Sequence, residues 1–286
     1  MCERHDHVLT MSKVPPDRTA PLGVFDSGLG GLTVVRALRA LLPDEHIVYL
    51  GDTARVPYGT RAPSTVVRYA MGCANWLVSR EVKAIVIACN TVSAVAPERL
   101  RADLDLPVLG VIEPGAHAAV AATKSGRIGV LATAGTTASG AYPRAVATMS
   151  TRCEVFGQAA PLLVPLAEEG WTTGEVPRLA IRKYLEPLAR AKVDVVVLGC
   201  THYPLFRPLI DEEIHAMLGP DTRVVDSAAT VAHDVQAFLK SRDLLRPNGG
   251  DTPLLHLAVT DMPKSFGEVA VRFLGSAVDD VEQIDL

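Results

Sequence analysis

The sequence lacks the features that mark membrane-spanning, secreted and nucleic-acid-binding proteins. No apolar stretch approaches the ~18 residues that a membrane-spanning helix requires. The net charge of -4 comes with no long basic run, which disfavours a surface for nucleic acid or membrane. Residues 1–20 are polar and lack the ~7–15-residue apolar segment of a secretory signal. We therefore expect them to form a loose N-terminal extension.

Cysteine is also scarce, with 5 residues in a chain of 286. This number does not suggest a disulfide framework, so a reducing, cytoplasmic location is expected. The closely spaced cysteine pairs of zinc sites are absent, as is the Cys-x-x-Cys spacing of a redox pair. The thiols of such a chain remain available for chemistry.

The chain does contain a regular alternation of short apolar runs and helix-periodic segments from about residue 22 onward. Its length predicts about two domains, at ~150 residues each. Strands are expected at 22–25, 47–50, 84–88, 108–111, 127–131, 193–198 and 224–226, with a weaker one at 254–259. Helices are expected at 32–42, 64–80, 115–123, 176–191, 205–218 and 228–242. This pattern predicts an α/β fold with mostly parallel sheets flanked by helices.

A repeat underlies this alternation. Gly23 opens a strand-to-loop corner ahead of Cys89, and Gly129 opens a similar corner ahead of Cys200 at comparable spacing. Two pseudo-symmetric domains explain the repeat, with the active site in the cleft between them. The expected division is a loose extension at 1–20, a first domain at 21–113 plus 225–286, and a second domain at 114–224. The alternative is chance, because α/β proteins commonly repeat such corners.

Cys89 and Cys200 occupy matching positions in this repeat. Each follows a β-branched and aliphatic run typical of a buried strand, and each precedes small polar residues that can begin a helix. Side chains at the carboxyl ends of parallel strands project into the crevice where such sheets bind ligands. Amides at a helix N-terminus are expected to lower the pKa of both thiols. Two thiols facing one substrate can remove a proton from one face of a carbon and return one to the other.

Further polar residues follow the expected strands. The loop at 26–31 is rich in glycine and suits an anion, either a carboxylate or a phosphate, but its spacing matches no nucleotide-binding motif. Asp26 either caps the following helix or handles a substrate ammonium group or its proton. The same alternatives apply to Asp52, in the turn-rich segment 51–59. His202 lies two residues after Cys200 and is a candidate general acid.

Other interpretations of the thiols remain open. A zinc site at Cys200 and His202 is short of ligands. A cysteine hydrolase with His202 as its base leaves Cys89 without a role. A non-catalytic small-molecule binding protein needs a cleft but has no use for two thiols. Cys73 and Cys153 are interpreted as small core residues.

Four segments, in this order along the chain, resemble motifs of the glutamate racemases. They are 25–31 (FDSGLGG), 51–59 (GDTARVPYG), 88–91 (ACNT) and 199–204 (GCTHYP). The wider family of cofactor-independent amino-acid racemases includes aspartate racemases, so aspartate or another acidic amino acid is the alternative substrate. The resemblance covers residues 22 to about 226. It implies two pseudo-symmetric domains that enclose the substrate, and a reaction without cofactor or metal.

The resemblance also implies roles for individual residues. Cys89 and Cys200 act as bases on opposite faces of the α-carbon. Asp26 assists Cys89, and His202 assists Cys200. The residues expected to hold the substrate are Asp26, Ser27, Asp52, Pro57, Tyr58, Gly59, Asn90, Thr91, Thr136, Thr201 and His202, with Thr137 as the alternative to Thr136.

A further acid near Cys200 corresponds to Glu168, with its neighbour Glu169 as the alternative. The implied activity is that of an isomerase that interconverts L- and D-glutamate in the cytoplasm and supplies D-glutamate for peptidoglycan, and so for cell-wall biogenesis and cell shape. The implied partner is glutamate, with no nucleic acid and no membrane, and relatives are often homodimers. Some relatives with longer N-termini are regulated by a cell-wall precursor and others bind DNA gyrase. Residues 1–20 assign neither property to this chain.

Overall fold

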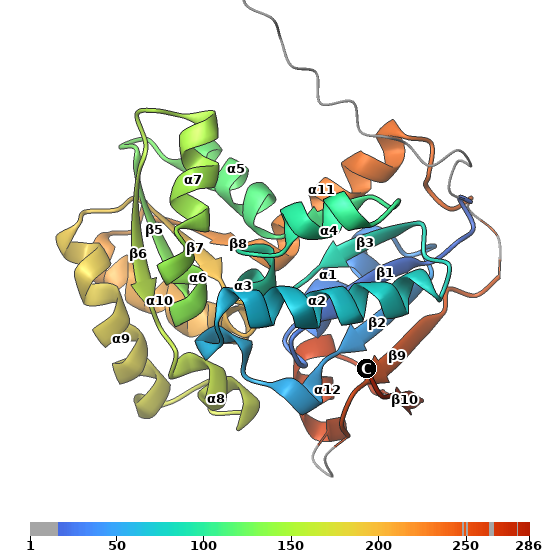
Figure 1. Ribbon diagram of the computed structural model, residues 1–286. Coiled ribbons are helices and arrows are strands. Elements are labelled where there is room, and N and C mark those ends of the chain that lie inside the picture. Colours follow the sequence, from blue (N-terminus) through green and yellow to red (C-terminus); the bar gives the residue numbers. More distant parts are fainter. Residues whose placement is uncertain (1–16, 248, 250, 263–265, 279) are drawn as a thin grey trace, which may run out of the picture.

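Two parallel β-sheets, each surrounded by helices, form the protein (Figure 1). The computed structural model describes residues 17–247, 249, 251–262, 266–278 and 280–286. The larger sheet has the strand order β10-β9-β2-β1-β3-β4 and the smaller one β6-β5-β7-β8, and the strand pairs are parallel. The predicted fold class, α/β with parallel sheets flanked by helices, is confirmed.

The strands of the larger sheet are β1 (Leu22–Asp26), β2 (Ile47–Gly51), β3 (Ala84–Ile87), β4 (Val108–Gly110), β9 (Leu255–Val259) and β10 (Val281–Gln283). Those of the smaller sheet are β5 (Arg127–Ala132), β6 (Glu154–Ala159), β7 (Val195–Gly199) and β8 (Arg223–Asp226). The α-helices are α1 (Leu32–Leu41), α2 (Pro63–Val78), α3 (Asn90–Ser93), α4 (Pro97–Asp103), α5 (Ile112–Ala122), α6 (Ala134–Ser139), α7 (Ala141–Met149), α8 (Leu163–Glu168), α9 (Glu175–Arg190), α10 (Arg207–Leu218), α11 (Ser227–Ser241) and α12 (Phe266–Leu274). Short 3-10 helices are η1 (Thr53–Arg55), η2 (Tyr58–Thr60) and η3 (Tyr203–Phe206).

The larger sheet buries side chains on both faces. Consecutive residues of a strand point to opposite faces. In β1, Val24 therefore joins a hydrophobic cluster with Leu38 of α1, while Phe25 joins another cluster with Leu77 of α2. This is why the central strands are continuous apolar runs, and why they were recognisable in the sequence.

The division of the chain into two domains stays a proposal, and the strand order supports it. The first four strands and the last two form one sheet, while β5 to β8 form the other. Helix α11 follows β8 and returns to pack on α1 as well as on α5. Residues 1–16 of the expected extension lie outside the described residues. Arg18 is held to the body, with its Nε donating to the Leu245 carbonyl at 3.1 Å.

Several elements were missing from the expected set. Strands β6 and β10 lie at sheet edges and are partly exposed, so they lack a strong apolar pattern. Helix α5 begins at Ile112, three residues before the expected start, with Pro114 in its first turn, where no backbone N–H is needed.

Among the described residues, no helix combines the length and apolar character needed to cross a bilayer.

Candidate active site

The first thiol corner lies where β1 and β3 end. Asp26 is 1% exposed, and its Oδ2 accepts hydrogen bonds from the amides of Gly28 at 3.2 Å and Gly31 at 3.0 Å. Its Oδ1 is buried without a partner among the described residues. Ser27 Oγ lies 3.3 Å from the sulfur of Cys89. The loop thus places a carboxylate and a hydroxyl beside the thiol.

The second thiol corner lies at the end of β7. Cys200 Sγ is 3.8 Å from His202 Nδ1, and His202 Nε2 is 3.0 Å from Glu168 Oε1. Glu168 is the last residue of α8, and its neighbour Glu169 makes no such contact with His202. Thiol, imidazole and carboxylate are therefore connected in series by two contacts. Of the two alternative acids, the structure brings Glu168 to His202.

The two corners meet although they belong to different sheets. Thr33 Oγ1, on α1, donates to the carbonyl of Thr201 at 3.0 Å. A Cβ added to Gly30 would lie 2.2 Å from Thr201 Oγ1 and 2.5 Å from His202 Nδ1. Only glycine at position 30 permits this approach. The glycine-rich loop is thus where the first sheet contacts the second thiol corner.

Burial and charge make the two corners unlike each other. Burial, with the charge of Asp26, raises the pKa of Cys89 to about 12 despite hydrogen bonds from Ser27 and the amide of Val92. Burial alone would lower the pKa of His202, but hydrogen bonds and charges from Cys200 and Glu168 outweigh it and raise the pKa to about 10. At neutral pH, Cys89 is therefore a neutral thiol and His202 an imidazolium.

The expectation that helix amides lower both thiol pKa values is wrong for Cys89. It caps α3, which is only four residues long, and desolvation in this buried position dominates. Cys200 does not begin an α-helix, because a turn at Thr201 and His202 and then η3 follow it. Its positive neighbour is the His202 ring.

Burial also raises the pKa of the Asp26 carboxyl, with the charge of His202 and the loop amides opposing the shift. Its unpaired Oδ1 is a ready acceptor for a proton or an ammonium group. A buried carboxylate oxygen without a partner is costly. Such an oxygen marks a position where a ligand can bind.

Three threonine hydroxyls, one of them two residues after Cys89, face one another. Thr91 Oγ1 lies 2.9 Å from Thr133 Oγ1, and Thr136 Oγ1 lies 3.0 Å from Thr133 Oγ1. Thr91 and Thr136 were expected at the site, whereas Thr133 was missed. Gly59 belongs to the same place, because a Cβ on it would lie 3.2 Å from the Thr133 Cβ. Thr137 Oγ1 is buried without a partner among the described residues.

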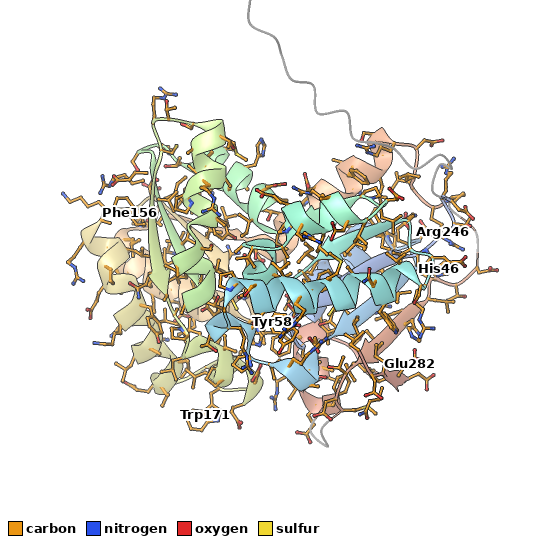
Figure 2. The ribbon with its side chains drawn as sticks, viewed as in Figure 1. His46, Tyr58, Phe156, Trp171, Arg246 and Glu282 are labelled. Carbon is orange, nitrogen blue, oxygen red and sulfur yellow. The ribbon has the colours of Figure 1, made fainter. Side chains whose placement is uncertain are left out.

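Asp52 lies in a buried polar cluster of its own. It accepts hydrogen bonds from the Tyr58 hydroxyl, from Arg55 Nε at 2.6 Å and from Thr260 Oγ1 at 2.8 Å. Tyr58 is buried near the middle of the molecule (Figure 2). The adjoining Pro57 is exposed. Asp52 thus holds the 53–60 loop through its own hydrogen bonds, and a substrate contact from Asp52 or Pro57 stays a prediction.

Asn90 was expected at the site, but Tyr142, Ser227 and Phe273 beside the expected residues were not recognised in the sequence. Asn90 bonds through its side chain to Tyr142 and Ser227. Phe273 of α12 meets the His202 ring edge-on, with the ring centroids 4.9 Å apart. These partners are far from the motifs in sequence, and a buried Phe or Tyr carries no local signal of function. Within the described part of the chain, no group of three or more His, Cys, Asp or Glu residues is arranged to hold a metal ion.

Two parallel sheets that each end in a thiol, with an acid or an acid–imidazole pair beside it, match the arrangement expected of an amino-acid racemase. The model of the Asp/Glu/Hydantoin racemase family matches residues 32–235. The chain belongs to this family and, within it, to the glutamate racemases.

Its relatives support this placement. It is 49% identical to the glutamate racemase of Geobacter metallireducens, over 93% of this chain and 96% of the relative. A solved glutamate racemase from Bacillus anthracis superposes with a TM-score of 0.88 at 36% identity, covering 94% of this chain and 98% of that one. The glutamate racemase of Francisella tularensis, solved with D-glutamate, superposes with a TM-score of 0.86 at 33% identity, with the same coverage.

Proposed function

We propose that this chain interconverts L- and D-glutamate by proton transfer between the α-carbon and two cysteines, without a cofactor. The observation that carries the proposal is the convergence of Cys89 and Cys200 from two sheets, one as a neutral thiol and the other beside an imidazolium. Inversion in a single pass requires a base on one face and an acid on the other. This asymmetry supplies both.

In one direction, Cys200 is the base. Its thiolate, held beside His202, takes the α-proton, so that the C–H bond breaks and an S–H bond forms. On the opposite face the S–H bond of Cys89 breaks and a new C–H bond forms. Hydrogen bonds with Cys200 and then with Glu168 favour the charged form of His202. In the other direction the two thiols exchange roles, and Asp26, whose charge acts on Cys89, accepts the proton of that thiol.

The carbanion between these steps has no cofactor to delocalise its charge. Fixed donors must therefore stabilise the charge that develops on the substrate carboxylate, and one such donor contributes about 3–4 kcal/mol in other enzymes. We assign this role to the hydroxyls of Thr91, Thr136 and Thr201, together with Ser27 and Asn90. The unpaired Oδ1 of Asp26 is placed to accept from the substrate ammonium.

Cys89 and Cys200 are each only 5% exposed. Entry of glutamate therefore requires a more open arrangement of the two sheets, and closure then excludes water from the reacting groups. We further propose that the product serves peptidoglycan synthesis and that the protein acts in the cytoplasm.

The test is incubation with L- or D-glutamate in D2O, with a chelator and no added cofactor. NMR follows loss of the α-proton signal, and circular dichroism follows loss of optical activity. Loss of both supports the proposal, and aspartate in place of glutamate tests the alternative substrate. Folded, reduced protein that leaves both amino acids unchanged would rule the proposal out.

A further inference from the structure

The side chain of Asn90 is the centre of a buried hydrogen-bond chain. The Tyr142 hydroxyl donates to Asn90 Oδ1 at 2.8 Å, and Asn90 Nδ2 donates to Ser227 Oγ at 3.3 Å. Ser227 Oγ donates in turn to the Leu198 carbonyl at 2.8 Å. The side chains of Tyr142, Asn90 and Ser227 lie in residues that are at most 2% exposed. Asn90 directly follows Cys89, so this series of hydrogen bonds is attached to the first thiol corner.

Both partners of Asn90 rest on the end of β7, which leads into Cys200. Leu198 is two residues before Cys200, and the Ser227 bond is made to its carbonyl. A Cβ on Gly199 would lie 3.2 Å from Tyr142 Cε2, so the phenol ring packs against the residue directly before Cys200. The Asn90 carboxamide therefore links the position of one thiol to that of the other.

We propose that Tyr142, Asn90 and Ser227 form a tether that sets the relative position of Cys89 and Cys200. Tyr142 and Ser227 are then positioning residues for the reaction, acting through Asn90. The inference rests on the proposed function, because two-base inversion needs both sulfur atoms in line with one α-carbon. Displacing a reacting group by ~1 Å costs about 100-fold in rate. Asn90 keeps a second Nδ2 hydrogen for the substrate.

The tether controls how each carbanion is consumed. When both thiols are in place, the proton is removed at one face and solvent-derived deuterium is added at the other, so the product alone is labelled in D2O. When the second thiol is displaced, protonation of the carbanion at that face is slower. The first thiol then exchanges its proton for deuterium from solvent before it reprotonates the carbanion. The recovered substrate, of unchanged configuration, then carries deuterium.

The test compares Tyr142→Phe and Ser227→Ala with wild type in D2O at early conversion. Both variants are expected to lower kcat about 10- to 100-fold, with KM changed less than threefold, and to raise the deuterium content of recovered substrate relative to product. Tyr184→Phe is the matched control. Tyr184 lies on α9. Its hydroxyl accepts a hydrogen bond from the Leu162 amide at 3.3 Å and is not part of the tether.

Hydrogen–deuterium exchange of the ligand-free protein provides a readout that does not depend on activity. Exchange should rise at 89–94 and at 199–203 in both tether variants, and stay unchanged there in Tyr184→Phe. Folded tether variants with wild-type labelling ratios and wild-type exchange at both segments would overturn the tether. Wild-type protein that fails to racemise glutamate would instead refute the proposed function, and the exchange measurement would still decide the tether.

Discussion

Single residues decide the protonation states on which the reaction depends. Cys89 is surrounded by apolar groups and the Asp26 carboxylate, which both favour the neutral thiol. Cys200 has an imidazole 3.8 Å away that is charged at neutral pH. The resting protein thus holds an acid at one corner and, at the other, a thiol whose charged form has a cation beside it.

Replacing either reactive thiol with a hydroxyl should abolish most of the activity. Cys89→Ser and Cys200→Ser are each expected to lower kcat about 100-fold or more, because serine is a far weaker acid and base at neutral pH. Circular dichroism with each enantiomer measures the rates. Cys153→Ser, at a half-buried cysteine away from the site, is the control. A serine variant with wild-type turnover would remove that cysteine from the reaction.

The adjacent glutamates offer a matched pair of variants. Glu168→Gln removes the charge bonded to His202 and should lower kcat about 10-fold. Glu169→Gln should leave kcat unchanged. Because the enantiomers have equal free energy, kcat/KM must fall equally in the two directions, whereas kcat and the deuterium isotope effect can differ between them. An equal loss of kcat in Glu168→Gln and Glu169→Gln would contradict the role of Glu168.

The raised pKa of His202 makes stability depend on pH. An ordinary histidine has a pKa near 6.5, and this one has a pKa of about 10 in the folded protein. Its contribution is therefore complete below pH ~6.5 and is lost as the pH rises toward 10. The difference in Tm between wild type and His202→Asn should be largest at pH 6 and shrink by pH 10. A difference that grows with pH would reverse the assignment.

At the scale of elements, α12 links the C-terminal part of the chain to the second thiol corner. Arg272 donates to the Glu168 carbonyl, which ends α8 and so has no partner within that helix. The next residue, Phe273, packs edge-on against the His202 ring. One helix packed on α1 therefore holds both members of the acid–imidazole pair.

Weakening the contacts of α12 with Glu168 and His202 should lower kcat and change the free energy of unfolding only slightly. Arg272→Met and Phe273→Leu are expected to lower kcat about threefold to tenfold, since each releases one side of the Glu168–His202 pair. Unfolding in urea should change by less than about 1.5 kcal/mol for Phe273→Leu, because leucine keeps most of the buried volume. Val271→Ala, at an exposed position of the same helix, is the control. Unchanged kcat in both variants would make α12 a purely structural element.

At the scale of the whole molecule, a buried ion pair joins segments that are distant in sequence. Lys83 Nζ donates to Glu45 Oε2 at 2.5 Å and to the carbonyls of Arg18 and Leu244, each at 2.9 Å. Glu45 Oε1 accepts from the Arg246 amide at 2.8 Å. Arg246 lies at the edge of the molecule, away from the central Tyr58 (Figure 2). The pair thus closes the end of the larger sheet opposite the thiols.

Breaking this ion pair should lower the free energy of unfolding and leave kcat unchanged. Lys83→Met leaves the Glu45 carboxylate buried and unpaired, and should lower the free energy of unfolding by about 3–5 kcal/mol. The double variant Lys83→Met with Glu45→Leu should recover part of the loss, because no charge is then stranded. Urea unfolding measures both effects. A loss below about 1 kcal/mol in the single variant would show that the pair is not needed for stability.

The sequence by itself determined the central strands, their parallel arrangement and the two matching thiol corners. It could do so because a strand buried on both faces is written as a continuous apolar run, and because the strand end sets where the next side chain points. Tertiary structure alone decided that Glu168 rather than Glu169 meets His202, that the pKa of Cys89 is raised, and that Asn90 is bound to Tyr142 and Ser227. Each of these depends on desolvation or on contact with distant segments. Local sequence patterns do not indicate which distant residues will bury a group or contact it.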